Sequence, residues 1–112
     1  MTWGVLILRP DGTRETRTLG LHEMPPAIPL RDVVRELLGI GAAWPEHVAV
    51  LHEGRRADMF VHEDGHGERL PRNEAATAIY RAWHLSQNPG EDPEASPWIA
   101  GPAVIFDRIV WS

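Results

Sequence analysis

Apolar residues near the start of the chain form a run of strand length that is followed by a polar one. Residues 3–8 are apolar apart from Gly4, which is the pattern of a buried central strand. Pro10-Asp11-Gly12 is a turn signal. The polar residues 13–19, rich in Thr, Arg and Glu, suit a second strand that pairs back as a solvated edge. The chain is therefore expected to begin with two paired strands.

Two later segments have the spacing of helices. In residues 30–38 the apolar positions fall at i, i+3, i+4, i+7 and i+8, the stripe of an amphipathic helix. Pro29 suits the first position of this helix, and Gly39 suits its end. Residues 73 to about 87 predict a second helix. Its apolar face would consist of Ala76, Ile79, Tyr80 and Trp83.

Three further apolar runs complete the expected secondary structure. Residues 48–51, 59–61 and 103–106 are read as strands, and the pattern does not define their order in a sheet. Residues 88–97 carry three prolines and three acids, which favours an extended or polyproline-like loop. The order ββαββαβ predicts one α+β domain over residues 1–112, with two helices packed on one face of a mixed or mainly antiparallel sheet.

Composition narrows the classes of function. A net charge of −5 argues against a basic nucleic-acid-binding surface. The absence of cysteine excludes disulfides and thiolate zinc sites. The first apolar run is too short for a signal-peptide core or a membrane span, so we expect a cytoplasmic protein without a membrane partner. All eleven basic residues are arginine, which is typical of a GC-rich genome.

One string resembles a catalytic motif. His62-Glu63-Asp64-Gly65-His66 matches the H-E-x-x-H pattern of zinc proteases, which works only when a helix places both histidines on one face. Asp64-Gly65 is a turn signal, so we expect a solvated turn instead of a helix. A looser metal site formed by His52, His62 and His66 with neighbouring acids remains a weak alternative.

Other arrangements for catalysis are absent from the sequence. No serine has the context of an activated nucleophile, and no glycine loop for phosphate is present, so we expect no catalytic residues and no cofactor. Arg55 and Arg56 in a turn, with Arg72 and Asn73 before the second helix, could instead receive an anionic group. The usual alternative is that such arginines are simply solvated.

Tryptophan is abundant, with five residues in a chain of 112. Such large side chains serve first as core material and second as interface anchors. Trp98 follows the acidic, proline-rich segment, and Trp111 lies next to the last residue. Both are expected to be partly exposed, as the anchors of a protein-contact surface are.

The start of the second helix carries a family resemblance. Residues 70–77 read Leu-Pro-x-Asn-x-x-Ala-Thr, in which Asn73 suits the N-cap and Glu74 favours the positive end of the helix dipole. This segment, followed by the strand that begins near Ile99, resembles a small domain family of unknown function found in phages, plasmids and other mobile elements. The residues that carry the resemblance are Leu70, Pro71, Asn73, Ala76, Thr77 and Gly101.

The resemblance implies a setting and no catalytic residues. It covers most of the chain, but residues 88–97 and the double proline at 25–26 depart from the pattern. We expect a non-enzymatic accessory protein of a phage or mobile element that binds a host protein through the Trp98 loop and the start of the second helix. One alternative is a small-ligand or nucleotide-binding module that uses the four residues Arg55, Arg56, Arg72 and Asn73. A weaker one is a metal-dependent enzyme that uses the histidines and acids of residues 52–68.

Overall fold

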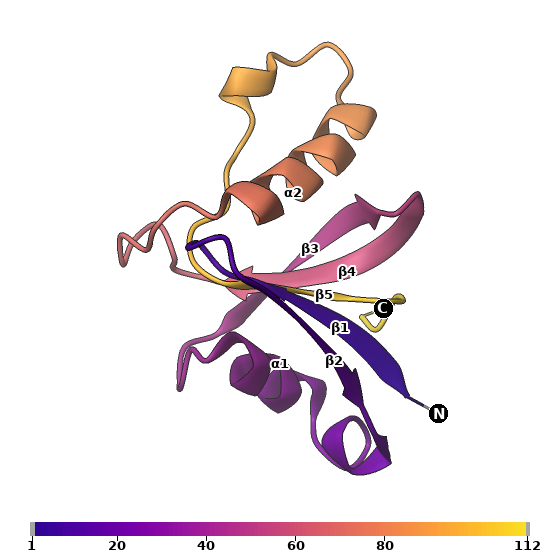
Figure 1. Ribbon diagram of the computed structural model, residues 1–112. Coiled ribbons are helices and arrows are strands. Elements are labelled where there is room, and N and C mark those ends of the chain that lie inside the picture. The colour runs from indigo at the N-terminus through magenta and orange to yellow at the C-terminus, as the bar shows by residue number, and fades with distance from the viewer. Residues whose placement is uncertain (1, 112) are drawn as a thin grey trace.

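The computed structural model describes residues 2–111 and confirms an α+β domain of order ββαββαβ (Figure 1). The strands are β1 (Trp3–Leu8), β2 (Arg14–Leu19), β3 (Pro45–His52), β4 (Arg55–His62) and β5 (Ala103–Phe106). The helices are α1 (Leu30–Leu38) and α2 (Glu74–Gln87), with single 3-10 turns η1 (Leu21–Glu23) and η2 (Pro93–Ala95). No helix of residues 2–111 is long and apolar enough to cross a membrane.

The five strands form one sheet in the order β2-β1-β5-β4-β3, and every pairing in it is antiparallel. Two hairpins, β1–β2 and β3–β4, form the two sides of the sheet. The last strand, β5, lies between them, so that Ile105 faces Leu6 of β1 and Met59 of β4. A strand in this position has neighbours on both edges, and all four residues of β5 are buried.

The two helices cover opposite faces of the sheet, so the expectation that both pack on one face is wrong (Figure 1). Val104 and Phe106 belong to the core under α1, whereas Ala103 and Ile105 belong to the core under α2. Successive side chains of a strand point to opposite faces. A central strand that is apolar at every position therefore needs to be covered on both faces of the sheet. Here α1 covers one face and α2 covers the other.

The helices begin and end close to the capping residues that the sequence predicts. Pro29 is the N-cap of α1, one residue earlier than expected, and Gly39 ends the helix with a positive φ of 67°. Asn73 caps α2 as predicted, because its Oδ1 accepts a hydrogen bond from the Ala76 N–H.

The segment between α2 and β5 is not the extended, polyproline-like loop that was expected. It forms a turn after Asn88 and then η2, which Asp92 caps by accepting a hydrogen bond from the Glu94 N–H. Arg81 of α2 donates to the carbonyl oxygen of Ser96 at 3.0 Å and to that of Pro97 at 3.4 Å. The end of the loop is therefore held against the helix, immediately before Trp98.

Candidate functional site

Three side chains from separate parts of the chain meet beside the start of α2, and we call them the Trp98 patch: His66, Arg72 and Trp98. The Arg72 guanidinium carbon lies 5.6 Å from the centroid of the Trp98 ring. The His66 ring meets the same indole edge to face at 4.2 Å, and its Nε2 donates to the Trp98 carbonyl oxygen at 2.7 Å. Trp98 is half-buried, while Arg72 and His66 are exposed. Arg72 also pairs with Glu74 at 3.0 Å. An aromatic ring with an arginine and a histidine beside it is thus held at the surface.

Asn73 lies behind this patch and has no exposed surface. Its Nδ2 donates to the carbonyl oxygen of Leu8 at 3.0 Å and to that of Gly101 at 2.9 Å. Its main-chain N–H donates to the Ile99 carbonyl oxygen at 2.8 Å. All polar groups of its side chain are used inside the protein. Asn73 therefore ties α2 to β1 and β5, and no ligand can reach it in this conformation.

The other residues of the Leu-Pro-x-Asn-x-x-Ala-Thr segment also join α2 to the start of β5. Thr77 Oγ1 accepts a hydrogen bond from the Ile99 N–H at 2.9 Å, and the Gly101 N–H donates to the Pro71 carbonyl oxygen at 2.8 Å. Gly101 has a φ of 87°, and a Cβ there would lie 2.7 Å from the side chain of Leu70. The residues that carry the family resemblance are therefore explained by the fold.

The two remaining predicted binding residues lie at the far end of β4 from the Trp98 patch. Arg56 donates to Asp58 Oδ1 at 2.8 Å and is thereby occupied within the protein. Arg55 is exposed, and it forms no ion pair within residues 2–111. The structure thus brings Arg72 and Trp98 together but leaves Arg55 and Arg56 apart from them.

The histidines considered for a metal site do not converge. His52 is paired with Arg55 at the β3–β4 turn, whereas His62 is paired with Pro45 at the other end of the same two strands. His62 Nδ1 accepts a hydrogen bond from the Asp64 N–H, and His66 belongs to the Trp98 patch. In the part of the chain that the structure describes, no group of three His, Asp or Glu side chains could hold a metal ion. The H-E-x-x-H string forms a turn, as predicted.

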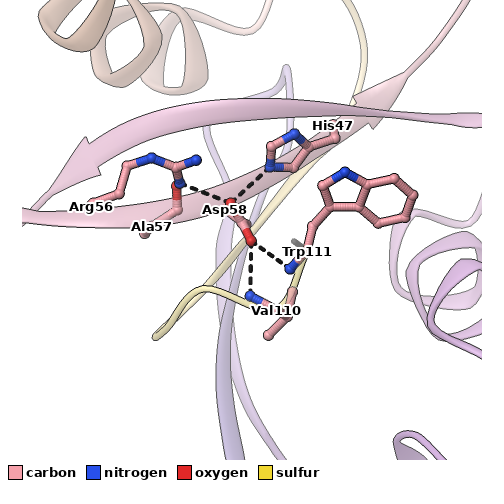
Figure 2. Close-up of polar contacts among 6 residues, drawn as sticks. All are labelled: His47, Arg56, Ala57, Asp58, Val110 and Trp111. Carbon is pink, nitrogen blue, oxygen red and sulfur yellow. Dashed lines mark hydrogen bonds and ion pairs between the residues drawn. The ribbon is translucent and has the colours of Figure 1, made fainter.

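A buried carboxylate that the sequence analysis missed lies on the α1 face of the sheet (Figure 2). Asp58, with 0% exposure, accepts hydrogen bonds at Oδ1 from His47 Nε2 (2.7 Å) and Arg56 (2.8 Å). Its Oδ2 accepts the N–H groups of Val110 and Trp111, each at 2.8 Å. In the sequence, this site could have been found from Asp58 alone, because it is an acidic residue next to the apolar run of β4. Asp58 therefore fastens the C-terminal segment across the sheet.

The charge of Asp58 is stabilised by these donors. Burial alone would raise the pKa of Asp58, but the hydrogen bonds from Arg56, His47 and the N–H groups of Trp111 and Val110 outweigh it and lower the pKa to about 2. An Asp–His pair also orients the imidazole of serine hydrolases. Here the imidazole packs against the rings of Phe60 at 5.4 Å and Trp111 at 6.0 Å. The contacts of His47 therefore help to hold the C-terminal segment, residues 110–111, against the sheet.

A trough of about 560 Å³ lies on the other face of the sheet, the face that α2 covers in part. Its floor is apolar and includes Leu6 and Ile105. Thr16 and Thr18 form one wall, because they stand directly opposite Leu6 and Gly4 in the register of β1 and β2. The opposite wall is the tip of the β3–β4 hairpin. Its trough-lining residues are His52, Glu53 and Arg55. The trough therefore combines an apolar floor with hydroxyls, the guanidinium groups of Arg17 and Arg55, and the carboxylates of Glu53 and Asp107.

Comparisons with known proteins add no assignment to these surfaces. Protein-family models, curated proteins and solved structures contain no match to this chain. The function of the Trp98 patch and of the trough therefore has to be argued from their own geometry.

Proposed function

We propose that this chain is a non-enzymatic accessory protein of a phage or mobile element, and that it acts by binding a host protein through the Trp98 patch. The observation that carries the proposal is the half-buried Trp98 ring, which lies beside both Arg72 and His66. Tryptophan and arginine are the residue types most enriched among the residues that dominate binding energy at protein interfaces. The setting in a mobile element rests on the resemblance of residues 70–77.

The position of Trp98 supports a role in recognition because it is fixed before a partner arrives. Arg81 holds the two carbonyl groups before the ring, and His66 holds the carbonyl group of Trp98 itself. A side chain that is already ordered loses little conformational entropy on binding. Most of the energy of covering the indole would therefore appear as affinity.

Trp98→Ala should weaken binding of the host partner at least about tenfold, because truncation of a central interface residue removes on the order of 2 kcal/mol. The measurement is affinity purification from host lysate with the wild-type chain, followed by titration of the recovered protein against each variant. Trp44→Ala is the matched control. Trp44 is 52% exposed, and the guanidinium groups of Arg31 and Arg35 lie 4.7 and 4.6 Å from its ring centroid.

The control separates recognition from a general loss of exposed tryptophan. A partner retained by Trp44→Ala and lost by Trp98→Ala supports the proposal, provided that both variants melt cooperatively. Equal binding by the wild type and Trp98→Ala would remove the patch from the interface. Recovery of no host protein above background would contradict the proposed function as a whole.

The trough supports a second candidate function, the binding of a small ligand or nucleotide. Such a ligand would place an apolar part on Leu6 and Ile105 and an anionic group near Arg55. Of the four arginine and asparagine residues first considered for this role, Arg55 alone lines the trough. This alternative therefore depends on a different surface from the protein-binding proposal.

A thermal-shift panel of nucleotides and small organic anions tests the second candidate. A ligand at one hundred times its Kd should raise Tm by on the order of 10 °C, since binding to the folded state alone stabilises it by about 2.7 kcal/mol. Arg55→Ala should abolish the shift, and Arg14→Ala, which removes an exposed arginine outside the trough, should leave it. A shift that survives Arg55→Ala, or no shift with any compound, would rule out binding at the trough.

A further inference from the structure

The outer edge of β3 is a long strand edge without a partner. β3 pairs with β4 on one side, and no other strand of residues 2–111 pairs with its second side. The eight-residue strand is paired in continuous register, contains no arginine, and has its one proline at the first position. Charged residues, bulges and internal prolines are among the devices that block edge pairing. The edge at β2 carries Arg14, Glu15 and Arg17, whereas β3 has only Glu46 as a permanently charged residue.

The hairpin geometry shows which backbone groups of β3 are free. Glu53 and Gly54 form a two-residue loop with positive φ values of 52° and 77°. In an antiparallel pair, residues alternate between facing the partner strand and facing away. The Glu63 N–H donates to the Trp44 carbonyl oxygen at 3.0 Å, so even-numbered residues of this segment face β4. The backbone groups of His47, Ala49 and Leu51 therefore point outward.

We propose that two copies of this chain pair through β3, antiparallel and related by a two-fold axis at Ala49. In this register Ala49 faces the partner's Ala49, and His47 faces the partner's Leu51. All three outward-facing residues then take part in the new ladder. Pro45, which has no N–H to donate, stays outside it. The product is one continuous ten-stranded sheet made of two five-stranded halves.

The side chains of β3 are complementary to themselves in this register. On the α2 face, Glu46 stands opposite the partner's His52 at both ends of the interface, whereas Val50 is already buried within its own subunit. Polar side chains that face each other directly across an antiparallel pair, such as a carboxylate and an imidazole, stabilise the pairing. A shift of two residues in either direction separates Glu46 from the partner's His52. The Glu46–His52 pairs therefore favour one register.

The other face supplies an apolar contact. Trp111 is 54% exposed and stacks on His47 at 6.0 Å. Because the partner's Leu51 would stand opposite His47, an exposed indole and a half-buried leucine would become neighbours across the interface. Pairing through β3 would therefore explain why a side chain as large as Trp111 is exposed beside this strand.

The first test is the solution mass of the full chain, measured by light scattering after size exclusion and by sedimentation. The wild type should be a dimer in reversible equilibrium with its monomer. Ala49→Pro should be a monomer with an unchanged circular dichroism spectrum, because its N–H points away from β4. Thr16→Pro is the matched control on the other edge. The backbone groups of Gly4 bond to Asp107, on the β5 side of β1, and therefore point away from β2. The backbone groups of Thr18 and Thr16, which are paired with Gly4 and Leu6, point away from β1 in the same way and so face outward. This variant should remain a dimer.

Charge exchange gives a second test that does not depend on proline. His52→Glu alone places two acids opposite each other and should raise the dimer Kd about tenfold. Glu46→Arg combined with His52→Glu should return the Kd to the wild-type range. A wild-type chain that sediments as a monomer at every concentration would overturn the proposal. So would an Ala49→Pro variant that remains a dimer, or a double variant that does not recover pairing.

Discussion

Asn73→Ala should lower the free energy of unfolding by about 3–7 kcal/mol. The substitution removes the cap of α2, which is worth about 1 kcal/mol, and leaves the carbonyl oxygens of Leu8 and Gly101 without their donor. Unsatisfied buried groups cost about 1–3 kcal/mol each. Domains of this size are stable by about 5–15 kcal/mol, so a large part of the total depends on this side chain. Urea unfolding followed by circular dichroism gives the value directly.

Two further variants separate the cap from the two cross-links. Asn73→Asp keeps an oxygen for the Ala76 N–H but places a carboxylate against two carbonyl oxygens, so it should be at least as unstable as Asn73→Ala. Asn88→Ala removes an exposed side chain at the other end of α2 and should change stability by less than about 1 kcal/mol. If Asn73→Asp were as stable as the wild type, the bonds to Leu8 and Gly101 would contribute nothing.

Acid should weaken the fold partly through Asp58. The pKa of Asp58 is about 2 in the folded protein, below the ordinary aspartate value of 3.8. A group with a lowered folded-state pKa stabilises the protein above its unfolded pKa, and this stability is lost as the pH falls through the folded value. The shift corresponds to about 2 kcal/mol, which should disappear between about pH 5 and pH 2.

The comparison of the wild type with Asp58→Asn isolates this contribution. Other acids with lowered pKa values, such as Asp107 beside Arg108, are unchanged in both proteins and cancel in the difference. The difference in unfolding free energy should therefore shrink by about 2 kcal/mol as the pH is lowered across that range. A difference that stays constant with pH would show that Asp58 is not the titrating anchor. Tryptophan fluorescence should report release of Trp111 over the same range.

The order and type of the elements could be predicted because each depends on local pattern. The stripe at residues 30–38, the apolar run at 103–106 and the cap at Asn73 all correspond to observed elements. The side on which each helix packs depends on the whole sheet. The order of strands that brings α1 and α2 to opposite sides of the sheet is a property of long-range pairing.

The surfaces were harder to predict than the elements for the same reason. Arg72 and Trp98 meet because Arg72 forms a bridge with Ala100, which brings two distant segments together. The anchor at Asp58 requires Val110 and Trp111, more than fifty residues away in the chain. Asn73 was correctly predicted as a cap, but its donors to Leu8 and Gly101 turn an apparent surface residue into a buried cross-link. Spacing along a sequence carries no information on such contacts.

The position of β5 at the centre of the sheet has a consequence for biosynthesis. The two hairpins are translated first, and they share no strand pairing until residues 103–106 have left the ribosome. Isolated two-stranded hairpins are marginally stable in water. The nascent chain must therefore stay open, with its strand edges exposed, until nearly all of the residues described have been made. A chain stalled before β5 would be a natural substrate for chaperones and proteases.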